Sequence, residues 1–334
     1  NRKSPPKTRD CRRRSRTMPP SHPPRWETLR WEGDTGGQLV VLDQTHKFSE
    51  HVESFGADFY RTCWELLVVV DYMQKMVRET RPYEVNEGET DRTYRTCLNE
   101  LAEVAERKGD YFALVPTIRE RLQAIPVDRS EKRPLIGVVG EIYVRSNDFA
   151  NNFLVRRIED CGAQAMLPPF QEWINYIAAD RREIAWENGQ IWSFVKEWLT
   201  EFAARWTEGR IGKNFRGAIE HLPRESTIDE VIDLGTEYID PTVKGESILS
   251  MGRAVEYAEH GFDGIVNVAP FGCMPGAVVN SLLERFRTQY GLPVLKLDYD
   301  GLQQASEGTA LEAFVHQARE HMNKKSPTAE HAQS

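Results

Sequence analysis

The chain has 334 residues, of which 40% are hydrophobic and 28% are charged. This composition is typical of a globular protein and excludes a wholly disordered one, and at roughly 150 residues per domain the length predicts two structural units. No run of about 18 apolar residues occurs, so the sequence predicts no membrane-spanning helix. The net charge of −8 divides into +8 for residues 1–30 and −16 for the rest. An acidic body argues against nucleic acid as the main partner.

The ends of the chain differ in composition from the body. Residues 1–45 are rich in Arg and Pro and show no sustained periodicity, so we expect a disordered basic head or a mis-translated start, with a nucleic-acid-binding arm as the minor alternative. The head lacks the apolar segment of a secretory signal. Residues 326–334 are expected to form a short tail.

Five cysteines are scattered along the chain, at Cys11, Cys63, Cys97, Cys161 and Cys273. No C-x-x-C pair occurs, which excludes a zinc ribbon and a thioredoxin-type motif. A chain of this length does not need disulfides, so the expected compartment is the reducing cytoplasm.

Residues 46–130 are predicted to be helical. Apolar residues at steps of three and four indicate a helix from about Ser49 to Glu79, which Arg81-Pro82 ends. Two further helices are predicted over 89–107 and 110–124.

Residues 131–325 are predicted to form an α/β domain. Apolar runs indicate strands near 135–143, 163–167, 264–269 and 293–298, with helices between them. Ser146 or Asn147 is expected to cap a helix that ends near Asp160. The fold class is therefore a doubly wound α/β domain with a mainly parallel four-stranded sheet over about 134–323, preceded by a helical segment.

A helical insertion is expected over about 170–218. It carries one apolar face, which we expect to be core, made of Phe194, Val195, Trp198, Leu199, Phe202 and Trp206.

The loop from Pro270 to Gly276 is the most informative candidate site. Ligands bind at the carboxyl ends of the strands in such sheets, and Cys273 lies there between Gly272 and Gly276, just before a helix. A helix N-terminus favours a thiolate, which ligates metal or attacks an electrophile. The alternative is a tight turn with a small residue where the backbone is crowded.

Three further residues are predicted to line the same crevice, because they follow neighbouring strands: Glu141, Asn147 and Asp298. No ATP site is predicted. Asp233-Leu234-Gly235-Thr236 resembles the phosphate loop of an actin-like ATPase but lacks a preceding buried strand, and Gly212-Lys213-Asn214 does not complete a P-loop.

Several motifs together resemble a known family. They are Arg81-Pro82-Tyr83-Glu84, Pro126-Val127-Asp128-Arg129, the strand from Gly137 to Arg145, Leu167-Pro168-Pro169 with Glu172-Trp173, and the segment from Asn267 to Gly276. In this order they resemble the C-terminal part of the large activase-related proteins of the 2-hydroxyacyl-CoA dehydratase system, the CoA-substrate-specific enzyme activase family, over roughly residues 55–323. Those proteins fuse actin-like ATPase modules to a module similar to the D component of the dehydratase.

The resemblance implies a cytoplasmic iron–sulfur protein, with a 4Fe-4S cluster held by cysteine thiolates and electrons supplied by ATP hydrolysis. Only Cys273 matches a family cysteine that ligates the cluster, so the ligand set in this chain is expected to be incomplete. The implied partners are actin-like ATPase modules or dehydratase subunits, with an acyl-CoA as the small molecule. The chain is expected to be a fragment of a longer protein.

Two hypotheses of function follow. The first is an iron–sulfur-associated redox module that serves a 2-hydroxyacyl-CoA dehydratase or a related reductase through Cys273. The second is a cluster-free scaffold or docking module without catalysis of its own. A third, a hydrolase or transferase with Cys273 as nucleophile, is weak because no histidine lies in the loops after the predicted strands to act as its base.

Overall fold

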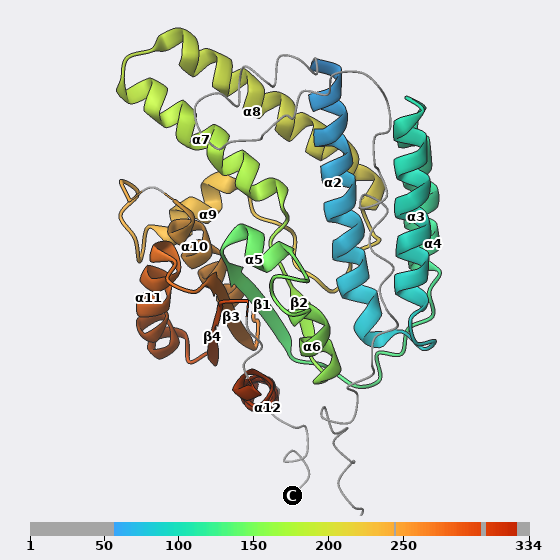
Figure 1. Cartoon of the computed structure of the whole chain (residues 1–334), viewed down its shortest axis with the longest axis vertical. Helices are drawn as coiled ribbons and strands as arrows, with labels where there is room; N and C mark the ends of the chain where they lie inside the picture. Colours follow the sequence, from blue (N-terminus) through green and yellow to red (C-terminus); the bar gives the residue numbers. More distant parts are fainter. Residues whose placement is uncertain (1–56, 244, 302–304, 326–334) are drawn as a thin grey trace, which may run out of the picture. The chain divides into compact units, whose positions relative to one another are not determined.

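Four parallel strands form the central sheet of the chain in a computed structural model, which describes residues 57–243, 245–301 and 305–325 (Figure 1). The strands are β1 (Leu135–Gly140), β2 (Gln164–Met166), β3 (Gly264–Pro270) and β4 (Val294–Tyr299), in the order β2-β1-β3-β4. Ile136 pairs with Gly264, and Ile265 pairs with Val294. The predicted parallel sheet is confirmed, and each strand lies within a few residues of its predicted place.

Helices cover both faces of this sheet, because the apolar runs of the strands point side chains in both directions. One face packs against α10 (Glu246–Glu259) and α11 (Met274–Tyr290). The other face packs against α6 (Leu154–Asp160) and α12 (Ala305–Lys325). The doubly wound arrangement is therefore confirmed.

A helical segment precedes the sheet, as predicted. It contains α2 (Ala57–Thr80), the 3₁₀ turn η3 (Arg81–Tyr83), α3 (Glu89–Glu106), the 3₁₀ turn η4 (Tyr111–Leu114) and α4 (Val115–Gln123). A second apolar core joins α2 from Val68 onward to α3 and α4, and includes Ile211 and Phe215 from farther along the chain. The predicted start near Ser49, the basic head and the tail lie outside the described residues.

The segment after β1 departs from the prediction. We expected one helix from Ser146 or Asn147 to Asp160. Instead α5 (Ile142–Ser146) ends at Asn147, and α6 begins only at Leu154. The Asn147 side chain accepts hydrogen bonds from the N–H groups of Phe149 and Ala150 at 3.0 and 3.1 Å. Such Asx turns compete with helix formation, and positive φ at Asn152 and Phe153 completes the break.

The helical insertion contains a hairpin of α7 (Gln171–Glu187) and α8 (Ile191–Gly212), followed by the 3₁₀ turn η5 (Lys213–Phe215) and by α9 (Ile228–Gly235) (Figure 1). The expectation that the aromatic stripe of α8 is core is wrong. Trp198, Phe202 and Trp206 are 50%, 59% and 60% exposed, and the buried side chain in this stretch is Glu201. Helical periodicity indicates that one face differs from the other, but it does not say which face is covered.

The chain divides into two units, residues 1–63 and 64–334, so the helical segment from Trp64 onward and the sheet belong to the same unit. Among the described helices, none combines the length and the apolar character needed to cross a bilayer.

Candidate functional site

The candidate site is a crevice at the carboxyl ends of β1 and β3, where the chain connections leave to opposite sides and ligands bind in such sheets. Gly140 ends β1 with φ +119° and lies directly against β3, because a Cβ there would be 2.0 Å from the carbonyl oxygen of Val268. The N–H of Glu141 donates to the same oxygen at 2.9 Å. This close approach turns the chain out of the sheet at the crevice.

Two glutamates lie at the start of two helices beside this turn. Glu141 caps α5 by accepting a hydrogen bond from the N–H of Val144 at 2.8 Å. Glu246, at the start of α10, accepts one from the N–H of Ile142 at 3.2 Å. Burial, together with the charge of Glu141, raises the pKa of Glu246 above its ordinary range. The crevice is therefore acidic, and a hydrogen-bond donor or a cation is favoured in it over an anion.

Asn267 brings a polar side chain into the otherwise apolar strand β3. It is 1% exposed, and its Nδ2 donates to Oδ1 of Asn280 at 2.9 Å. Its own Oδ1 is buried and has no hydrogen-bond partner among the described residues. A buried acceptor without a partner is destabilising unless a ligand or water supplies a donor.

The crevice encloses about 10 Å³, which is room for one group of the size of a water molecule. It is lined by Gly140, Glu141, Glu246, Ser247, Ser250, Asn267, Pro275, Gly276 and Val279. The lining thus combines two carboxylates with the unpaired amide oxygen. It suits a single donor group, such as a hydroxyl or an amine.

Cys273 is the N-cap residue of α11 and is half-buried beside the crevice. Its N–H donates to the carbonyl of Pro270 at 3.0 Å, and its carbonyl accepts from the N–H of Ala277 at 2.9 Å. A Cβ at Gly276 would lie 2.5 Å from Cβ of Ala269 and 3.6 Å from the Cys273 sulfur. The turn is tight, as the alternative of a small residue in a crowded turn predicts. It also leaves the thiol of Cys273 at the sheet edge.

Two of the predicted crevice residues lie elsewhere. Glu141 and Gly276 line the crevice and Gly272 belongs to its loop, but Asn147 and Asp298 are not among the lining residues. Asn147 is held in the turn after α5, and Asp298 is exposed on β4, paired with Ala269. The prediction missed Glu246, Ser247 and Ser250, because α10 comes to the crevice only through packing. The sequence did contain an indication of Asn267, since it is the only polar side chain in its strand.

Large apolar side chains are exposed in the segments that follow β1 and β3. Phe271 and Met274, which flank Cys273, are 76% and 77% exposed. Tyr143 and Phe149, in the segment after β1, are 60% and 87% exposed. We call these four residues the apolar rim. Clusters of exposed large apolar side chains mark interaction surfaces.

The cysteines do not fit an iron–sulfur cluster held by the described part of this chain alone. A cubane cluster takes about four thiolates. Cys97 is buried in the helical core, and Cys161 precedes the amino end of β2, at the edge of the sheet opposite Cys273. Among the described residues, no three His, Cys, Asp or Glu side chains are grouped as a metal site requires.

A buried ion network holds the elements around the crevice together. The carboxylate of Glu172, at the start of α7, accepts a hydrogen bond from Nη2 of Arg145 at 3.0 Å and another from Nε of Arg253 in α10. Arg253 also pairs with Glu256. Burial alone would lower the pKa of Arg253, but the surrounding carboxylates raise it well above its ordinary value, so the guanidinium is charged.

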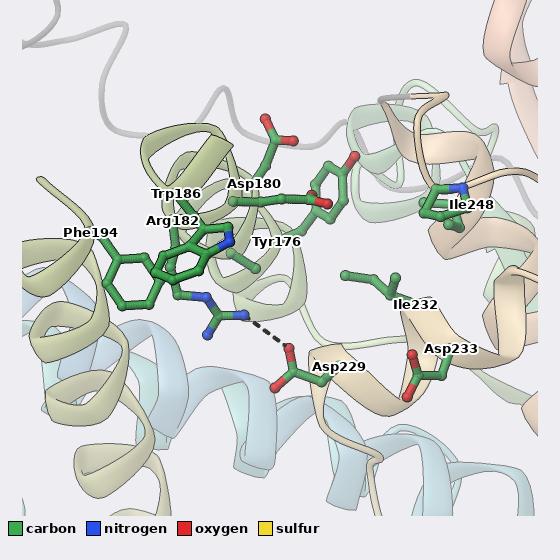
Figure 2. A pocket seen from close by; sticks show the side chains of 12 residues that line it. Tyr176, Asp180, Arg182, Trp186, Phe194, Asp229, Ile232, Asp233 and Ile248 are labelled. Carbon is green, nitrogen blue, oxygen red and sulfur yellow. Dashed lines mark hydrogen bonds and ion pairs between the residues drawn. The ribbon is translucent and has the colours of Figure 1, made fainter. Parts of the chain in front are cut away.

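A larger pocket of about 430 Å³ lies between the α7–α8 hairpin and α9–α10 (Figure 2). Its lining includes the aromatic residues Trp186 and Phe194, whose ring centroids are 5.3 Å apart, and the ion pair between Arg182 and Asp229. The pocket belongs to the hairpin and contains none of the predicted site residues.

No known protein family, curated protein or solved structure matches this chain.

Proposed function

We propose that the chain is a docking module without catalysis of its own, in which the apolar rim seats a partner protein over Cys273 and the crevice. The observation that carries this proposal is the exposure of Phe271 and Met274 on either side of the half-buried thiol. Fully exposed apolar side chains gain roughly 25 cal/mol per Å² when a partner covers them. Their position at the sheet edge directs that partner to the cysteine.

The crevice gives this docking its chemical specificity. The unpaired Oδ1 of Asn267 and the carboxylates of Glu141 and Glu246 accept hydrogen bonds. A lysine ammonium or a hydroxyl presented by the partner or its bound ligand fits a space of about 10 Å³. A carboxylate or phosphate there would face the two glutamates and is disfavoured.

The second candidate is the iron–sulfur-associated redox module expected from the resemblance. The place of Cys273, at the N-terminus of α11 and at the edge of the sheet, favours it. The remaining thiolates would have to come from other chains or from residues outside the described part. The partners of this proposal are dehydratase subunits or actin-like ATPase modules, with an acyl-CoA as the small molecule. This proposal places the chain in the cytoplasm, as the resemblance implies.

Charged substitutions on the rim test the docking function. Phe271→Asp and Met274→Asp are expected to weaken binding of the chain to isolated dehydratase subunits or ATPase modules at least tenfold, measured by calorimetry. Val85→Asp is the matched control, because Val85 is also apolar and 59% exposed but lies far along the chain from the rim. Equal affinities for all three variants and the wild type would refute the docking proposal.

Anaerobic reconstitution with iron and sulfide separates the two functions. If the redox candidate holds, the complex of the chain with its partner develops visible absorption that Cys273→Ser removes and Cys161→Ser leaves intact. Iron content unchanged by Cys273→Ser would eliminate Cys273 as a ligand and leave docking as the function.

A further inference from the structure

The outward face of α8 carries an aromatic stripe with the spacing of a helix–helix seam. We define the α8 stripe as Trp192, Val195, Leu199, Phe202 and Trp206, which follow each other at steps of three, four, three and four. Trp192 is 87% exposed, and Leu199 is 53% exposed. This alternation is the a/d pattern by which two helices pack side by side.

The opposite face of α8 is held against the molecule by polar contacts. Glu201, which is 5% exposed, pairs with Arg182 of α7. Nη2 of Arg205 pairs with Asp229 of α9, and Glu208 accepts a hydrogen bond from Gln171 at 3.0 Å. A rotation of α8 that buried the stripe would break these contacts. The stripe therefore faces outward as a fixed feature of the fold.

The exposed area is large enough for a stable interface. One aromatic side chain buries roughly 150–250 Å², so the exposed parts of Trp192, Trp198, Phe202 and Trp206 amount to about 500 Å² per chain. Leu199 and Ile191 add to this. A specific interface buries about 800 Å² per partner, of which about 57% is apolar, so one side of it needs roughly 460 Å² of apolar surface.

We infer that the occupant is a second copy of this chain, with the two α8 helices antiparallel about a two-fold axis at Leu199. In this arrangement Leu199 meets its own copy, Trp192 faces Trp206, and Val195 faces Phe202, which pairs a small side chain with a large one. The helix carries three Lys/Arg and three Asp/Glu, so two copies do not repel each other. Zero net charge also gives an anionic lipid surface no electrostatic attraction.

The surroundings of the two ends of α8 favour the antiparallel direction over the parallel one. Ile211 at the carboxyl end is buried in the helical core, whereas Trp192 near the amino end is exposed. Antiparallel pairing places the exposed end of one helix beside the embedded end of the other, so the two chains avoid each other. It also aligns the helix dipoles favourably. The pairing uses a different surface from the apolar rim and does not depend on Cys273.

Cysteine cross-linking of the full chain tests the arrangement. Leu199→Cys is expected to give a covalent dimer under mild oxidation. The matched stripe variant Val195→Cys is not, because residues 195 of the two copies would lie about 12 Å apart along the helices at 1.5 Å per residue, beyond disulfide reach. The wild type controls for native cysteines. Cross-linking of both variants indicates parallel pairing, and cross-linking of neither indicates no pairing, so either result overturns the inference.

The solution mass gives a second measure. By light scattering at micromolar concentration, the wild type and Ser193→Glu are expected at twice the chain mass of 38.4 kDa, and Leu199→Glu at 38.4 kDa. Circular dichroism confirms that the variants keep their fold. A wild type that stays monomeric overturns the inference, including the case in which deletion of residues 1–56 then allows dimers, because those residues would be the occupant.

Discussion

The guanidinium of Arg145 lies 3.0 Å from the carboxylate of Glu172, and both side chains are at least 97% buried (Arg145 3% and Glu172 3% exposed). Arg145 lies in the last turn of α5 beside the crevice and Glu172 in the first turn of α7, so this pair ties the candidate site to the insertion. Arg253 shares the same carboxylate.

Removing the shared carboxylate is expected to destabilise the chain strongly. Glu172→Gln leaves the buried guanidinium of Arg145 without its carboxylate and removes one of the carboxylates around Arg253, which costs about 3–5 kcal/mol in the free energy of unfolding. Glu100→Gln is the control, since Glu100 pairs with Arg121 at the surface, where a salt bridge contributes about 0–1 kcal/mol. Urea unfolding measures both, and equal losses would show that the buried network contributes nothing particular.

The pH dependence of stability should reveal Asp71. Burial raises its pKa from 3.8 to about 6, although the N–H groups of Phe170 and Gln171 donate to it and act in the opposite direction. Between these pH values the folded chain keeps a proton that the unfolded chain releases. The free energy of unfolding therefore falls as pH rises from about 4 to 6, by roughly 3 kcal/mol at most. The difference between wild type and Asp71→Asn, measured by urea unfolding across this range, isolates the effect. A flat difference would contradict it.

Two glycine-to-alanine substitutions, one at the site and one in α8, are expected to change the free energy of unfolding in opposite directions. Gly140→Ala places a Cβ 2.0 Å from the Val268 carbonyl at positive φ, so we expect a loss of at least about 3 kcal/mol. Gly209→Ala, inside α8 with no atom within 4 Å of its added Cβ, should stabilise by about 0.5–1 kcal/mol. Thermal and urea unfolding give both values, and a tolerated Gly140→Ala would mean that β1 does not press against β3.

The rate at which each cysteine is alkylated should decrease as the burial of its thiol increases. Cys97 is 0% exposed, and burial raises its pKa, so it is expected to react with an alkylating reagent only after unfolding. Cys273, half-buried at the sheet edge, should react in the folded chain. Peptide mass spectrometry after short labelling distinguishes the two sites. Early modification of Cys97 would place it outside the helical core.

Local apolar patterns predicted the sheet well, because strands such as Leu135–Gly140 and Gly264–Pro270 are buried on both faces and have continuous apolar sequences. The break between α5 and α6 escaped prediction, since it depends on the side-chain contacts of Asn147 with backbone groups. The direction of the α8 stripe also escaped, because Arg182 and Asp229, which hold the polar face inward, come from other helices.

The candidate site was predicted in part for the same reason. Cys273 and Glu141 follow strands directly, so the fold class alone brings them to one edge. Glu246 reaches the crevice only because α10 packs on the sheet, and the state of Asn267 depends on a contact with Asn280 in α11.

The anchoring of the hairpin has a mechanical consequence. Glu172 at the base of α7 cannot shift without leaving the buried guanidinium of Arg145 without its carboxylate, and Glu201 pairs α8 with Arg182 of α7. The hairpin is therefore attached rigidly to the rest of the unit and does not hinge at its base. A helix of 22 residues is about 33 Å long. If two chains pair through their α8 helices, the two rigid hairpins would fix the distance between the Cys273 side chains of the two copies.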